Sequence, residues 1–120
     1  MNKYVDYIMR DIGIPAHLDG YEAVRIVTEL RFNDNKLGIC KLYQLAAKQL
    51  DKSAQAVERN IRHLVTRMLT KGDMTKIINY FGASLPADGS LTNKQFIYTL
   101  AIAAKRIELE EDNNNVDNGR

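Results

Sequence analysis

The chain has 120 residues, of which 45% are hydrophobic, and a formal net charge of +2, values that fit one soluble globular domain. Its single cysteine, Cys40, excludes an internal disulfide and favours a reducing compartment. No stretch approaches the roughly 20 apolar residues that a membrane-spanning helix needs, and Met1–Arg10 lacks the apolar centre of a signal peptide. We therefore expect a cytoplasmic protein.

The spacing of apolar residues predicts an all-α fold with no strand. A first helix, capped by Asn2, is expected to end near Ile12, and a second is expected from about Gly20 to Phe32, with Gly13 and Pro15 between them. The side chains expected to be buried are Tyr4, Val5, Ile8 and Met9 on the first helix, and Tyr21, Val24, Val27 and Leu30 on the second.

The stretch from Tyr43 to Arg62 is typical of two helices joined by a tight turn. In the turn, Asp51 stands where a positive φ is needed, and Asp is among the few residues that tolerate one. Ser53 can cap the second helix. The apolar faces consist of Leu45, Ala46 and Leu50, with Ala47 placed for close helix contact, and of Val57, Ile61, Leu64 and Met68. This pattern indicates a helix-turn-helix, whose second helix lies in the DNA major groove. The alternative is a helical hairpin that merely packs.

The charge of the chain is concentrated around this unit. The range 41–76 holds eight basic and three acidic residues, and the range 108–120 holds one basic and five acidic residues. A positive face is what binding to phosphates requires. The alternative is a charged face that is merely solvated. The candidate DNA-binding residues are Lys48, Ser53, Gln55, Glu58, Arg59, Arg62 and His63.

The remaining helices follow from their start and stop residues. The second helix of the unit is expected to end at Lys71–Gly72, and Asp73 is expected to cap a short helix from Met74 to Phe81. After a loop from Gly82 to Leu91, a capping box of Thr92 and Gln95 opens the last helix, with Phe96, Ile97, Leu100, Ala104 and Ile107 on its buried face. We predict one helical domain over 1–111 and a disordered acidic, Asn-rich tail over 112–120.

Enzyme signatures are missing from the sequence: it has no glycine-rich phosphate loop, no nucleophile elbow and no spaced metal ligands. Three scattered residues, His17, Cys40 and His63, carry little weight as a catalytic set, because a lone cysteine is usually a small buried hydrophobe. We therefore expect no enzyme, no metal and no cofactor.

Three sequence blocks resemble one family. They are IGIPAHLDGY at Ile12–Tyr21, a recognition-helix core VERNIRH at Val57–His63 within Ala56–Gly72, and Phe81–Gly82 followed by Leu91–Asn93 and Phe96–Ile97. In this order and spacing they are similar to the C-terminal DNA-binding domain of the stage 0 sporulation response regulator of endospore-forming Firmicutes. The resemblance covers about Asp6 to Leu109.

The resemblance implies about six helices, sequence-specific binding to short promoter boxes, and base or phosphate contacts by Glu58, Arg59 and Arg62. It also implies homodimers side by side on tandem boxes, with RNA polymerase as a further partner. This chain has Ala56 where the family usually has an arginine, which favours an alternative: a helical protein–protein interaction module that keeps the fold but binds DNA weakly. The family's phosphoacceptor domain is absent from this sequence, which fits either an excised domain or a stand-alone effector.

Overall fold

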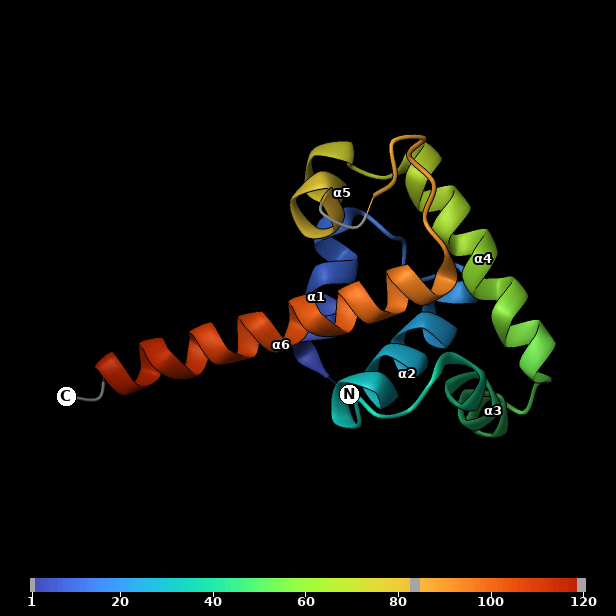
Figure 1. Ribbon diagram of the computed structural model, residues 1–120, viewed down its shortest axis with the longest axis horizontal. Coiled ribbons are helices and arrows are strands. Elements are labelled where there is room, and N and C mark those ends of the chain that lie inside the picture. The colour runs from blue at the N-terminus through green and yellow to red at the C-terminus, as the bar shows by residue number, and fades with distance from the viewer. Residues whose placement is uncertain (1, 83–84, 119–120) are drawn as a thin grey trace.

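The computed structural model describes residues 2–82 and 85–118, with side chains described up to residue 114. Within these ranges the chain forms six α-helices and no strand, which confirms the all-α class. Their bounds are α1 Lys3–Ile12, α2 Asp19–Asn33, α3 Ile39–Leu50, α4 Ala54–Lys71, α5 Met74–Phe81 and α6 Asn93–Asn118. Figure 1 shows α1 to α5 and the first half of α6 gathered into one body, from which the second half of α6 projects. None of the described helices is long and apolar enough to cross a membrane.

The first helix begins and ends as its sequence predicts. The side chain of Asn2 accepts hydrogen bonds from two backbone N–H groups of the first turn. At the other end Gly13 has a φ of 91°, and the N–H groups of Gly13 and Ile14 donate back to carbonyls of the last turn. Glycine adopts this left-handed conformation without the steric cost that a Cβ brings. The chain can therefore change direction at Gly13, and after a short loop α2 packs against the rest of the body.

Helix α2 is the central element, because it contacts α1, α3, α4 and α6. A helix packed on several sides buries more than one stripe of residues. Tyr21, Val24 and Val27 are buried as predicted, but Leu30 is only partly buried. Further buried residues that the single-stripe pattern missed are Ala23, Ile26 and Thr28.

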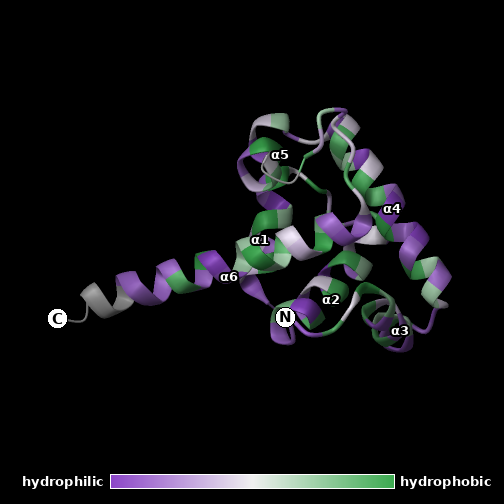
Figure 2. Cartoon of the chain, viewed as in Figure 1, coloured by the Kyte–Doolittle hydropathy of each residue, from purple (hydrophilic) through white to green (hydrophobic). Residues whose placement is uncertain are grey.

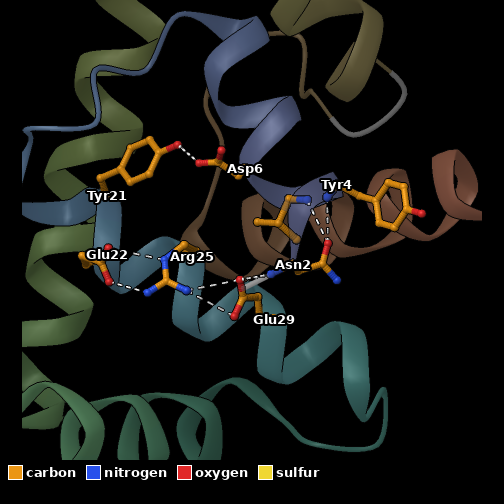
Figure 3. A network of polar contacts seen from close by, with 8 residues as sticks. Asn2, Tyr4, Asp6, Tyr21, Glu22, Arg25 and Glu29 are labelled. Atoms are coloured by element: carbon orange, nitrogen blue, oxygen red, sulfur yellow. Dashed lines mark hydrogen bonds and ion pairs between the residues drawn. The ribbon is translucent and has the colours of Figure 1, made fainter.

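A polar network joins α1 to α2 at the edge of this core (Figure 3). The hydroxyl of Tyr21 donates to the carboxylate of Asp6. Glu29 accepts a hydrogen bond from the backbone N–H of Asn2 at 2.6 Å and pairs with Arg25. The hydrogen bond from Tyr21 lowers the pKa of Asp6, and burial together with this carboxylate raises the pKa of Tyr21 to about 12. The network therefore favours a charged Asp6 and a neutral Tyr21 at neutral pH.

Helices α5 and α6 close the core from the side of α1. Asp73 caps α5, and Thr92 and Gln95 exchange hydrogen bonds of 2.9 and 3.1 Å as a capping box, both as predicted. The rings of Phe81 and Phe96 stack with centroids 5.4 Å apart. On α6 the predicted Phe96, Ile97, Leu100 and Ala104 are buried, and Ile107 is partly buried. Residues 83–84 of the predicted loop lie outside the described part.

The far end of α6 differs from the prediction. The helix continues to Asn118, whereas we expected helical structure to end after Glu111. High polarity does not by itself stop a helix, and no glycine or proline occurs in this stretch before Gly119. The carboxylate of Glu111 lies 3.3 Å from the ammonium of Lys3 on α1. Figure 2 shows the part of the projecting half that it colours as mostly hydrophilic. The division into a domain over 1–111 and a tail stays a prediction, and residues 119–120 lie outside the described part.

Candidate nucleic-acid interface

The turn between α3 and α4 has the backbone that the sequence predicts. Asp51 has a φ of 53° and is, among the described residues, the only one other than glycine with a positive φ. The N–H groups of Asp51 and Lys52 donate to the carbonyl of Ala47, which closes the end of α3. Two residues later the hydroxyl of Ser53 accepts a hydrogen bond of 3.0 Å from the N–H of Ala56, so that α4 begins almost at once. The turn thus fixes α4 relative to α3, and Figure 1 shows the two helices crossing at a steep angle.

The two helices pack through small and branched apolar residues. On α4 the predicted Val57, Ile61, Leu64 and Met68 are all buried, and Val65 is buried beside them. On α3 the buried residues are Leu42, Ala46 and Ala47. Leu45 and Leu50, predicted on the buried face of α3, are only partly buried. The predicted two-helix stretch began at Tyr43 and its apolar face at Leu45, so the prediction missed Leu42, which lies one turn before Ala46.

Most of the predicted DNA-binding residues lie on the outer face of α4. Arg59 is exposed and stands opposite the buried stripe, with Gln55, Arg62 and His63 exposed on either side of it. Ser53 is also exposed, but its hydroxyl serves as the cap of α4. Lys48 is exposed near the end of α3. The structure therefore brings the residues of α4 together on one face and places Lys48 on the neighbouring helix.

Glu58 lies at the edge of this face and pairs with Arg62. The guanidinium of Arg62 donates to both carboxylate oxygens of Glu58, at 2.8 and 3.0 Å. The two side chains are 56% and 36% exposed, so water screens the pair and its net stabilisation is small. The pair biases the direction of a long cationic side chain on the outer face. Arg62 therefore points toward Glu58 in the structure without being fixed there.

Two residues beside Glu58 were missed by sequence reasoning. The amide of Asn93, at the start of α6, donates a hydrogen bond of 3.0 Å to the backbone carbonyl of Glu58. Tyr43 on α3 is half-buried, and this burial raises the pKa of its hydroxyl. Both residues line a hollow of about 370 Å³ together with Glu58 and Arg62. Asn93 lies 35 positions from Glu58, so no local pattern could have indicated the contact.

On its other edge α4 is approached closely by the start of α2. A Cβ added to Gly20 would stand 2.5 Å from the backbone carbonyl oxygen of Asn60 and 2.9 Å from the Cβ of Leu64. Only glycine permits two backbones to come this near, which gives the glycine of the block IGIPAHLDGY a physical role. Helix α4 is therefore held between α2 on one edge and the start of α6 on the other.

The positive charge of α3 and α4 is largely uncompensated. Of the eight basic residues in 41–76, only Arg62 and Lys76 form an ion pair within the described part of the chain. The others are Lys41, Lys48, Lys52, Arg59, Arg67 and Lys71. Elsewhere in the described part, Lys3, Arg10, Arg25 and Lys105 pair with carboxylates, whereas Arg31, Lys36, Lys94 and Arg106 form no ion pair. Unpaired cations on neighbouring helices attract a polyanion.

The described residues offer little that suggests catalysis. They contain no group of three or more His, Cys, Asp or Glu side chains that could hold a metal ion. His17, Cys40 and His63 are all exposed and belong to the α1–α2 loop, α3 and α4 respectively. What the arrangement offers chemically is hydrogen-bond donors and positive charge on a convex helix face.

A compact all-helical body that presents one cationic helix on its outside is the architecture of a helical DNA-binding domain. Comparison with protein families agrees: the family model described as "Sporulation initiation factor Spo0A C terminal" matches residues 5–104. The chain belongs to this family, which is the DNA-binding domain of a sporulation transcription factor and not a family of enzymes.

Proposed function

We propose that this protein is a sequence-specific DNA-binding regulator of transcription, of the type that controls the start of sporulation. The observation that carries the proposal is the outer face of α4, where Arg59 stands exposed and Arg62 is held by Glu58 at 2.8 Å. An arginine fork can donate to both major-groove acceptors of guanine. Glu58 can accept from the amino group of cytosine or keep Arg62 oriented toward a guanine. In this proposal α4 lies in the major groove and α3 packs across its back.

The other predicted residues have lesser parts in the proposal. Gln55 and His63 flank Arg59 on the same face and contact bases or nearby phosphates. Ser53, near the start of α4, and Lys48, on α3, contact the phosphate backbone. Ala56 has no side-chain group that can hydrogen-bond to a base, so the bound sequence differs from that of relatives with arginine at this position. The protein binds tandem boxes as a homodimer in the cytoplasm and acts through RNA polymerase.

The decisive experiment selects bound duplexes from random DNA and then measures each variant on the selected and on a scrambled duplex. Arg59→Ala and Arg62→Ala should each reduce the preference for the selected duplex, by about 1–3 kcal/mol, without unfolding the domain. Lys48→Ala should weaken both duplexes about equally, because a phosphate contact carries no sequence information. If both arginine variants keep the wild-type preference, α4 is not the reading helix.

Salt dependence separates the proposal from the alternative of a protein–protein interaction module. With about five phosphates contacted, the logarithm of the binding constant should fall against the logarithm of the salt concentration with a slope of roughly −4 to −5. A flat response would contradict DNA binding by the cationic face and would favour the interaction module.

A further inference from the structure

The cations of α4 do not end with the residues that face bases. Arg59, His63, Arg67 and Lys71 follow one another at intervals of four residues, and all four side chains are exposed. Residues four apart lie on the same side of a helix, so they form one slowly turning ridge. We refer to these four residues as the basic ridge. Its second half, Arg67 and Lys71, lies beyond the residues to which the proposed function gives a role.

The length of α4 shows where that second half would lie on DNA. The helix has 18 residues and is therefore about 27 Å long, whereas the major groove of B-DNA is about 12 Å wide. The stretch from Gln55 to His63 already spans about 12 Å along the axis. A reading helix that enters the groove by its N-terminal half must pass the sugar–phosphate backbone with its C-terminal half. Arg67 and Lys71 lie about one and two turns beyond His63, at that passage.

The surface beside the basic ridge is concave and cationic. One hollow, of about 200 Å³, lies between His63 and Arg67 on α4 and Asp19 and Gly20 at the start of α2. A second, of about 170 Å³, lies between Arg67 and Lys71 and the segment Gly13–Pro15. Within the described part of the chain, neither Arg67 nor Lys71 forms an ion pair or a side-chain hydrogen bond, even though the carboxylate of Asp19 lines the same hollow as Arg67. Both cations are thus free to meet an external anion.

We propose that Arg67 and Lys71 bind backbone phosphates that flank the base pairs read by Arg59 and Arg62. This inference rests on the proposed function and deepens it, because it assigns a second, sequence-independent contact to the same helix. The complex then covers more of the duplex than the bases it reads, and Arg67 and Lys71 contribute affinity without contributing specificity. Asp19 limits that affinity, because its negative charge lies beside the phosphate position.

The test is the salt slope of the double variant Arg67→Gln/Lys71→Gln on the selected and the scrambled duplex. Each lost phosphate contact makes the slope less steep by about 0.9. The wild-type slope of roughly −4 to −5 should therefore become about −3 in the double variant. The preference for the selected over the scrambled duplex should stay as in the wild type. Arg106→Gln is the matched control, because Arg106 is exposed on α6 and forms no ion pair within the described part of the chain, and it should leave the slope unchanged.

Asp19→Asn supplies a variant with the opposite sign: it should raise the affinity for both duplexes by the same factor. Melting curves of every variant confirm that the fold is intact. The inference is overturned if the double variant keeps the wild-type slope, or if it loses preference for the selected duplex. Failure of the proposed function looks different, because the wild-type protein itself would then bind selected and scrambled duplexes alike, and both ideas would fall together.

Discussion

The close approach of α2 to α4 predicts that Gly20 cannot be replaced by alanine without a loss of stability. In Gly20→Ala the new methyl group would stand 2.5 Å from the carbonyl oxygen of Asn60 and 2.9 Å from the Cβ of Leu64. The oxygen belongs to the backbone of α4, so it cannot move without moving the helix. Overpacking of this kind costs about 1–3 kcal/mol. Alanine forms helices better than glycine, which offsets part of this cost, but the site is only the second residue of α2. We expect a net loss of about 1–2 kcal/mol.

For a domain of this size such a loss lowers the melting temperature by roughly 4–10 °C. The assay is thermal unfolding followed by circular dichroism at neutral pH. The matched control is Gly38→Ala. Gly38 is the N-cap of α3 and so also lies at a helix start, but a Cβ there would meet nothing within 4 Å. Because alanine is a poorer N-cap than glycine, the control should lose only a fraction of a degree to a few degrees. If Gly20→Ala melts at or above the wild-type temperature, α2 and α4 are not as close as described, and the position given for α4 is wrong.

Three further predictions concern the core, the far end of α6 and the acid stability. Val57→Asp would bury an unpaired carboxylate between α3 and α4 at a cost of several kcal/mol, out of a total stability of roughly 5–15 kcal/mol. Circular dichroism of this variant should therefore show a loss of helix or of cooperative melting. Melting close to that of the wild type would mean that this face is exposed. Deletion of 112–120 removes no side chain of the described core, so the melting temperature should change by no more than about 2 °C, and a drop of many degrees would show that the segment is part of the domain. The pKa of Asp6 is lowered in the folded state, so its contribution is present above the pKa of the unfolded chain, near 4, and is lost as the pH falls through the folded value. The melting temperature of Asp6→Asn should therefore fall less than that of the wild type when the pH is lowered from 6 to 3. An equal fall in both proteins would contradict the role of the Tyr21 hydrogen bond.

The elements that sequence reasoning predicted well are those with local physical causes. The caps at Asn2, Ser53 and Asp73 each depend on a side chain and an N–H group two or three residues away, and all three form as expected. The left-handed conformation of Asp51 follows equally from the tightness of its turn. The family was also within reach, because three blocks of sequence with their spacing carry it.

What the sequence could not supply depends on contacts between distant segments. Burial of α2 on several sides requires knowing which helices surround it, and the role of Gly20 requires knowing that Asn60 lies opposite. The contact of Asn93 with Glu58 is of the same kind. At the far end of α6, composition favoured a disordered tail, but the described helix runs on because no residue there breaks it. The predicted DNA contacts stay predictions, since they involve a partner that the structure does not contain.

The projecting half of α6 has a consequence for how the molecule approaches a charged target. Six cations without an ion pair in the described part of the chain lie on α3, on α4 and in the turn between them, while the carboxylates of Glu110 and Asp112 are exposed on α6, whose second half projects from the body of a molecule 49 Å long (Figure 1). With a net charge of only +2, the overall attraction to a polyanion is weak, so the local arrangement of charges decides which side of the protein faces it. If α4 is the DNA-binding helix, the field of a duplex attracts the cations of α3 and α4 and repels the carboxylates of α6. The molecule is thus oriented before the first contact, most effectively at low ionic strength, where the field extends furthest.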